Sequence, residues 1–298
     1  MRLLVARRRD EVKLVPTILF ESFRHGLRRW GMTVALASCS LQPAPIERAA
    51  MLAEHGRIED AIGVLEEHLA RDPASHDERK LLIRLHGSAG QLDAAMDQTE
   101  RLVELLPPGS PIPWVELGHA YELAHRYDEA LAAYDQAATI APNDALGPKR
   151  GGLRATRWGE LRWAEPRLEE AARRAPGDAE VWHALGLVRV GLGELDAARQ
   201  AYMAGLSADP SAIENHLGLA TVALRLDEPR AALEQYEALL RARPASTDAL
   251  LGKSWSLILL GELGDAEAVL MEAQARGADA RTIARQRLVM EERKRKLP

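Results

Sequence analysis

Alanine recurs through this sequence at a nearly fixed interval of 34 residues, with one extra residue between the second and third positions. The seven positions are Ala61, Ala95, Ala130, Ala164, Ala198, Ala232 and Ala266. The first six are each followed twelve residues later by a proline, namely Pro73, Pro107, Pro142, Pro176, Pro210 and Pro244, whereas the seventh has Ala278. Repetition at this period indicates a stack of similar units and not a single closed globule.

One copy, residues 111–144, shows the pattern most completely, with Trp114, Leu117, Gly118, Tyr121, Ala130, Tyr134 and Pro142. It resembles the tetratricopeptide repeat (TPR), and the resemblance covers about residues 42–280. The resemblance implies an all-α fold, a right-handed superhelical solenoid of about seven helix-turn-helix repeats. The expected repeats are 42–75, 76–109, 111–144, 145–178, 179–212, 213–246 and 247–280, and residues 281–298 are expected to form a basic capping helix.

Counted from the first residue of each repeat, a first helix is expected at about positions 2–14 and a second at about 18–30. Position 15 lies in the turn between them and is glycine in five repeats: Gly56, Gly90, Gly159, Gly193 and Gly261. Glycine can end a helix in the left-handed conformation without a side-chain penalty. His125 and Asp227 take this position in the other two repeats. The proline ends the second helix, because it has no amide hydrogen and clashes with the preceding turn.

The repeated alanine is expected where two helices cross closely, with Gly118 and Gly186 opposite it. Larger residues should fill the layers between repeats as core, and not as a ligand site; they are Trp114, Leu117, Tyr134, Trp182, Leu185 and Tyr202. The fourth repeat departs from the pattern, because Pro148 replaces the tryptophan and Gly151 and Gly152 lie inside its first helix. We expect that helix to be shorter or looser.

Charge is distributed unevenly along the chain. Residues 1–31 and 281–298 each carry a net charge of +5, so the rest carries −15 of the total of −5. An acidic body repels phosphate groups, which argues against a nucleic-acid partner. The composition, with 47% apolar, 28% charged and 4% aromatic residues, is typical of a helical protein rich in Ala, Leu, Glu and Arg.

The sequence shows no pattern typical of a catalytic site. Its single cysteine has no basic neighbourhood, and the nine histidines do not pair at the helical spacing of a zinc site. No glycine-rich phosphate loop follows a predicted strand. We therefore expect no enzyme activity, no cofactor, no metal and no small-molecule substrate.

In this family, first-helix positions 2, 5, 9, 12 and 13 line a concave groove, so the resemblance implies a peptide-binding site there. The corresponding residues are Val115, His119, Lys149, Leu153, Arg157, His183, Leu187, Leu217, Thr221, Arg225, Leu251 and Trp255. They mix apolar side chains with hydrogen-bond donors, which suits an extended or helical peptide. The lysine and asparagine set with which chaperone-binding members hold a terminal carboxylate is missing, so a co-chaperone role is not expected.

The region before the repeats resembles a bacterial lipoprotein signal. Arg28 and Arg29 precede nine uncharged residues, and Leu36, Ala37 and Ser38 stand directly before Cys39. Nine apolar residues are too few for a permanent membrane span, so residues 1–38 are expected to be a removable leader. Cys39 would carry the lipid, and residues 39–45 would form a tether. Ser40, in place of the aspartate that retains such proteins in the inner membrane, points to the outer membrane and its periplasmic face.

The length before the basic pair leaves a second interpretation open. Twenty-seven residues precede Arg28, more than such signals usually have, so translation would have to start near Leu27. Alternatively, residues 11–30 form a basic amphipathic helix on a cytoplasmic protein, although Pro16 interrupts its apolar stripe.

Together these patterns favour a lipid-anchored periplasmic adaptor without catalytic activity. The chain is similar in organisation to the assembly lipoproteins of tight-adherence (Flp) and type IV pili, which implies a secretin or pilus component as the protein partner. Two alternatives are a cytoplasmic TPR scaffold and a regulatory subunit in envelope polysaccharide synthesis.

Overall fold

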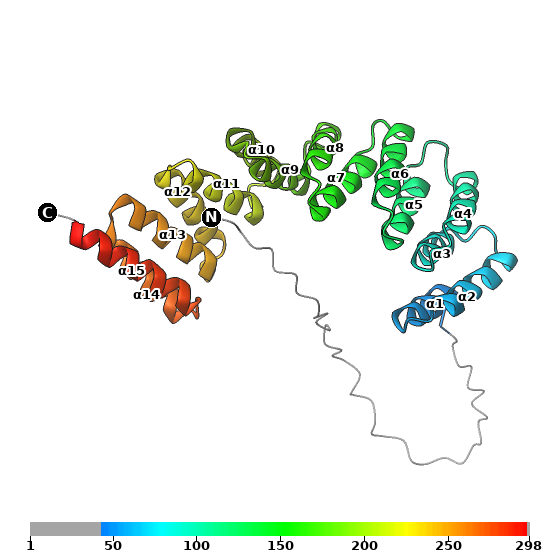
Figure 1. The fold of residues 1–298 in the computed structure, drawn as a ribbon, viewed down its shortest axis with the longest axis horizontal. Coiled ribbons are helices and arrows are strands. Elements are labelled where there is room, and N and C mark those ends of the chain that lie inside the picture. The colour runs from blue at the N-terminus through cyan, green and yellow to red at the C-terminus, as the bar shows by residue number, and fades with distance from the viewer. Residues whose placement is uncertain (1–42, 297–298) are drawn as a thin grey trace, which may run out of the picture. The chain divides into compact units, whose positions relative to one another are not determined.

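The computed structural model describes residues 43–296, and in this range the regular structure is entirely α-helical. Cys39 and the expected leader lie outside the described residues. Fifteen helices follow one another along the chain (Figure 1). They are α1 (Pro45–Glu54), α2 (Ile58–Arg71), α3 (His76–Ser88), α4 (Leu92–Leu105), α5 (Ile112–Leu123), α6 (Tyr127–Ile140), α7 (Leu146–Trp158), α8 (Leu161–Arg174), α9 (Ala179–Leu192), α10 (Leu195–Ala208), α11 (Ile213–Arg225), α12 (Pro229–Ala242), α13 (Thr247–Leu260), α14 (Leu263–Ala275) and α15 (Ala280–Lys296).

The first fourteen helices form seven hairpins, from α1–α2 to α13–α14, and each hairpin packs against the next. The predicted fold class, a TPR solenoid with a terminal helix, is therefore confirmed. From α1 to α9, each first helix (α1, α3 and so on) also contacts the first helix of the next described hairpin, whereas α11 and α13 make at most a weaker contact. Second helices of different hairpins make no comparable contact within the described residues. The first helices thus lie on the more closely packed face, which we call the inner face.

The turn inside each hairpin has the predicted left-handed residue. The five glycines at position 15 have φ angles between 73° and 87°. His125 and Asp227 adopt the same conformation, with φ angles of 59° and 60°. Among residues other than glycine, aspartate and histidine are enriched in this left-handed region, so both can take the place of glycine in the turn.

The repeated alanine is fully buried in all seven hairpins, as predicted. However, Gly118 and Gly186, the glycines at position 8 of their repeats, do not lie closest to this alanine. A Cβ atom at Gly118 would lie 2.5 Å from the ring of Tyr134, and one at Gly186 would lie 2.4 Å from the ring of Tyr202. The space that glycine leaves is therefore filled by the tyrosine at position 24 of the same hairpin.

The fourth hairpin corrects another expectation. Helix α7 has 13 residues, as many as α3 and α11, and is therefore not shortened. Pro148 is its third residue, where the amide has no acceptor within the helix, so proline costs little there. A Cβ at Gly152 would lie 2.6 Å from Leu168, and one at Gly147 would lie 2.6 Å from the backbone of α6. These glycines let α7 approach its neighbours closely instead of loosening it.

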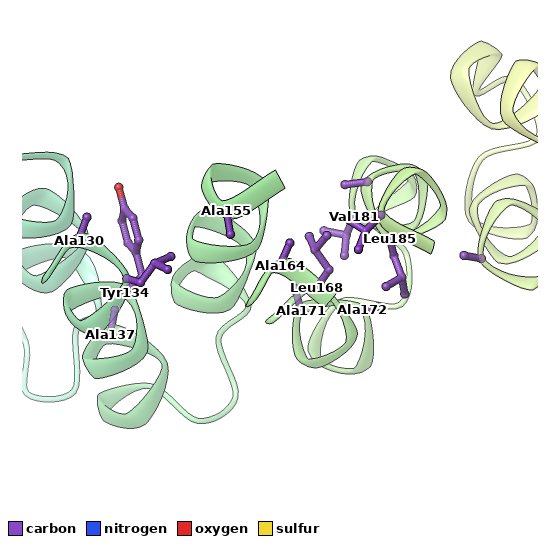
Figure 2. Close-up of a cluster of buried hydrophobic side chains, with 14 of the residues drawn as sticks. Ala130, Tyr134, Ala137, Ala155, Ala164, Leu168, Ala171, Ala172, Val181 and Leu185 are labelled. Atoms are coloured by element: carbon purple, nitrogen blue, oxygen red, sulfur yellow. The ribbon is translucent and has the colours of Figure 1, made fainter. Parts of the chain in front are cut away.

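The buried side chains form a series of clusters along the hairpins. The largest joins α5 to α10, and Figure 2 shows how its small alanines alternate with Tyr134, Leu168 and Leu185. At the carboxyl-terminal end, Ile283 and Met290 of α15 are buried against the last hairpin. Arg293 of α15 also donates to the carbonyls of Ile258 and Leu259, at 2.9 and 3.0 Å, near the end of α13.

A hydrogen bond links some hairpins to the proline that ends the preceding one. Position 4 is tryptophan in the family pattern, and Trp182 Nε1 donates to the Pro176 carbonyl at 2.9 Å. His216 Nε2 donates to the Pro210 carbonyl at 3.1 Å, and Arg79 Nη2 donates to the Pro73 carbonyl at 2.7 Å. Three different side chains thus satisfy one backbone acceptor at the same place.

We expect Gly186→Ala to destabilise the array, because the added methyl group would overlap the Tyr202 ring. Such overpacking costs about 1–3 kcal/mol, equivalent to a fall in Tm of about 2–4 °C for each kcal/mol. The matched control is Gly63→Ala within α2, where a Cβ would meet nothing within 4 Å. That change should raise Tm slightly, because alanine favours a helix over glycine. Thermal unfolding followed by circular dichroism measures both; an unchanged Tm for Gly186→Ala would contradict the tight contact.

Candidate peptide-binding groove

The predicted groove residues all lie on first helices, from α5 to α13, and therefore on helices of the inner face. Their exposure differs widely. Arg157, Leu187, Thr221 and Arg225 are exposed, with Leu187 46% accessible. Seven are half-buried: His119, Lys149, Leu153, His183, Leu217, Leu251 and Trp255. Val115 is only 4% exposed and packs in the core, so its side chain does not line a surface.

Lys149 is occupied by contacts within the protein. Its Nζ atom lies 2.6 Å from a carboxylate oxygen of Asp178 and 2.6 Å from one of Glu180, so it joins α7 to the start of α9. Burial alone would lower the pKa of Lys149, but the hydrogen bonds to these two carboxylates outweigh it and raise the pKa above 10.5. The Lys149 ammonium group therefore stabilises the contact between neighbouring hairpins and is less available to bind a peptide.

His183 and Arg225 also have partners. The His183 ring lies 6.0 Å from that of Tyr202, and burial lowers the pKa of His183 below its ordinary value. Burial thus disfavours the charged form of His183, which borders a cavity of about 500 Å³ between α9 and α11. Arg225 donates from Nη1 to the Val190 carbonyl at 3.2 Å, which leaves other N–H groups of its guanidinium for a ligand.

Two ion pairs on the inner face were not predicted. Arg84 Nη2 donates to Glu116 Oε1 at 2.7 Å, linking α3 to α5, and Arg154 lies 3.0 Å from Glu122, linking α7 to α5. Both pairs join residues 32 apart in the sequence. A search of the sequence for opposite charges 32 residues apart, two fewer than the repeat period of 34, would have found both ion pairs.

Glu116 is the most strongly perturbed carboxylate of this face. Burial alone would raise its pKa, but hydrogen bonds from His119 and Arg84 and the charge of Arg84 lower the pKa to about 2. The His119 Nδ1 atom lies 3.4 Å from Glu116 Oε2, so this predicted groove residue also supports the ion pair. Glu116 therefore remains charged at neutral pH and fixes α5 against α3.

Two other features, a metal-binding cluster and a membrane-spanning helix, are not found among the described residues. Between residues 43 and 296, no three His, Cys, Asp or Glu side chains gather in a way that could hold a metal ion. Among the fifteen helices, none has the length and apolar character needed to cross a membrane.

Comparison with known proteins agrees with this architecture. Models of the tetratricopeptide repeat match residues 111–144, 179–211 and 217–281. The three matched segments are thus tetratricopeptide repeats, which typically serve as modules for protein interaction. No curated protein matches the sequence significantly.

Several solved structures share the fold at low sequence identity. The C-terminal part of a TPR protein from Cytophaga hutchinsonii is 16% identical with a TM-score of 0.59, and the match covers 80% of this chain and 98% of that one. PilF of Pseudomonas aeruginosa is 17% identical with a TM-score of 0.52, covering 74% and 99%. The MamA protein is 18% identical with a TM-score of 0.52, covering 56% and 91%. At these identities the likeness is one of fold.

We expect Glu116→Gln to remove stability in a pH-dependent way. Because the folded pKa is depressed, the stabilisation is complete above the ordinary pKa of 4.5 and is lost as pH falls toward about 2. The variant should be less stable at pH 7 by roughly 3 kcal/mol, the free energy that corresponds to a pKa shift from 4.5 to about 2. The difference in Tm between the variant and the wild type should shrink between pH 4.5 and pH 2.

The matched control is Glu272→Gln, which breaks an ion pair with Arg276 whose side chains are 47% and 35% exposed. An exposed pair contributes at most about 1 kcal/mol, so its loss should change Tm little at any of these pH values. A pH-independent Tm difference for Glu116→Gln would contradict the depressed pKa.

Proposed function

We propose that this protein is a non-catalytic adaptor that binds a peptide segment of a protein partner along its inner face. The observation that carries the proposal is the group of exposed side chains on α7, α9 and α11: Arg157, Leu187, Thr221 and Arg225. Leu187 on α9 supplies an apolar anchor. Arg157 on α7 supplies a positive charge, and Thr221 and Arg225 on α11 supply a hydroxyl group and a second positive charge. Such a surface suits a peptide with an apolar side chain near acidic groups.

The partner belongs to an envelope machine, such as the secretin or another component of a tight-adherence (Flp) or type IV pilus. This part of the proposal is supported by the lipoprotein-like sequence that ends at Cys39. A lipid on Cys39 would hold the adaptor at the periplasmic face of the outer membrane, and confinement there raises the effective concentration of the two proteins. The fold shared with PilF is compatible with such a role but does not specify it.

A cytoplasmic scaffold is the second candidate. The observation in its favour is the apolar stripe and the basic residues within 11–30, a pattern that a basic amphipathic helix would show. In that case the same inner face binds its partner in the cytoplasm, and the basic residues near the amino terminus contact a partner or a membrane surface.

The inner-face proposal predicts that Leu187→Glu abolishes partner binding without affecting the fold. A charged group would replace the apolar anchor, and we expect co-purification of the partner to fall at least tenfold. The matched control is Met203→Glu on α10, a second helix, where the side chain is 53% exposed. A photo-crosslinker placed at 187 and at 203 should give a discrete crosslinked product only at 187. Equal products at both positions would argue against the inner face.

The anchor proposal predicts that Cys39→Ala moves the protein from the membrane fraction to the soluble fraction. Ser40→Ala is the control, because it retains the thiol and should leave the protein in the membrane. Mass spectrometry of the mature amino terminus distinguishes an acylated Cys39 from an intact Met1, and an intact Met1 favours the scaffold. If the pilus role is right, deletion of the gene should also reduce secretin multimers; normal multimers would refute that role.

A further inference from the structure

We propose that a cavity between the first two hairpins binds a carboxylate group through Arg79 and Arg101. The cavity measures about 630 Å³ and is bordered by α2, α3 and α4. Its apolar walls include Leu69, Leu82 and Leu105. Since α2 and α4 are second helices, this site is separate from the inner-face groove.

Arg79 has a buried positive charge, and no carboxylate between residues 43 and 296 forms an ion pair with it. Its residue is 3% exposed, and its Nη2 and Nη1 atoms donate to the Pro73 carbonyl and to Gln98 Oε1, at 2.7 and 2.5 Å. Both acceptors are neutral, and the Nε atom has no hydrogen-bond partner among the described residues. Burying an unpaired charge is costly, so an anion entering this cavity would gain a strong, charge-assisted hydrogen bond.

The fold itself does not require a charge at this position. His216 occupies the same place in the sixth hairpin and makes the same two contacts, with the Pro210 carbonyl at 3.1 Å and with Gln235 Oε1 at 2.8 Å. Trp182 makes the contact to its own preceding proline. The guanidinium of Arg79 thus adds a permanent charge and an N–H group without a partner among the described residues to a role that an uncharged indole fulfils at Trp182.

Arg101 of α4 brings a second positive charge to the same cavity. Burial, and secondarily the charge of Arg101, lower the pKa of Arg79, so the two guanidinium groups repel each other. Glu66 and Glu104 also border the cavity, yet neither forms an ion pair with either arginine within the described part of the chain. Two cations beside leucine side chains suit a carboxylate attached to an aliphatic group, either a chain terminus or an aspartate or glutamate side chain.

The test uses the full-length protein and three small probes: N-acetyl-leucine, N-acetyl-leucinamide and N-acetyl-glutamate α-amide. Ligand-observed NMR measures affinity, and the Nε–H resonance of Arg79 in ¹⁵N-labelled protein reports the site. We expect saturable binding of at least one carboxylate probe, with a shift of that resonance, and none of leucinamide. Tighter binding of N-acetyl-leucine identifies a chain terminus as the source, and tighter binding of the glutamate probe identifies a side chain. If no carboxylate probe saturates, the proposal is overturned.

Variants separate binding from folding. Arg79→His copies the His216 arrangement, so it should retain the helical circular dichroism spectrum and Tm while carboxylate affinity falls at least tenfold at pH 8. Arg101→Gln should weaken affinity several-fold. The control is Arg162→Gln on α8, an exposed arginine away from the cavity, which should leave affinity unchanged. A folded Arg79→His variant that binds as tightly as the wild type would disprove the role of Arg79.

Discussion

Contact between a small residue on one helix and a large residue on the next is the constraint on which this array depends. The Tyr202 ring is held between Gly186 of its own hairpin and Gly218 of the next, where a Cβ would lie 2.3 Å away. A single tyrosine therefore completes one hairpin and joins it to its neighbour. Since each of the described hairpins makes its main contacts with adjacent ones, stability is close to a sum of such local contacts.

The same close approach determines what the inner face offers to a partner. Where first helices meet, charged side chains reach across and pair, as Arg84 does with Glu116 and Lys149 with Asp178. These pairs fix neighbouring hairpins but take those charges away from a ligand. Of the predicted groove residues, the four that remain exposed lie on α7, α9 and α11, in the middle of the array.

Features set by backbone rules could be predicted from the sequence. Helix number, the left-handed turns at Gly193 and Asp227 and the burial of the repeated alanine all follow from periodicity and from residue types at fixed positions. Their physical causes act within a few residues, so one repeat explains the others.

Features set by the rotation of one helix against another could not be predicted in the same way. The contact of Gly186 with Tyr202, the regular length of α7 and the burial of Val115 depend on which side of each helix meets its neighbour. Lys149 looked like a free donor because its partners stand 29 and 31 residues away in the sequence. Family positions placed the predicted groove residues on first helices, but they did not predict the exposure of each side chain.

The hydrogen bond from position 4 to the preceding proline has an evolutionary consequence. The indole of Trp182, the imidazole of His216 and the guanidinium of Arg79 each donate this hydrogen bond to a proline carbonyl. Mutation can therefore exchange aromatic, titratable and permanently charged side chains at position 4 without disrupting the packing of neighbouring hairpins. Duplication of a hairpin would also copy this hydrogen bond to the preceding hairpin. A lineage of such proteins can therefore acquire side chains of different chemistry at the contacts between hairpins while the fold stays the same.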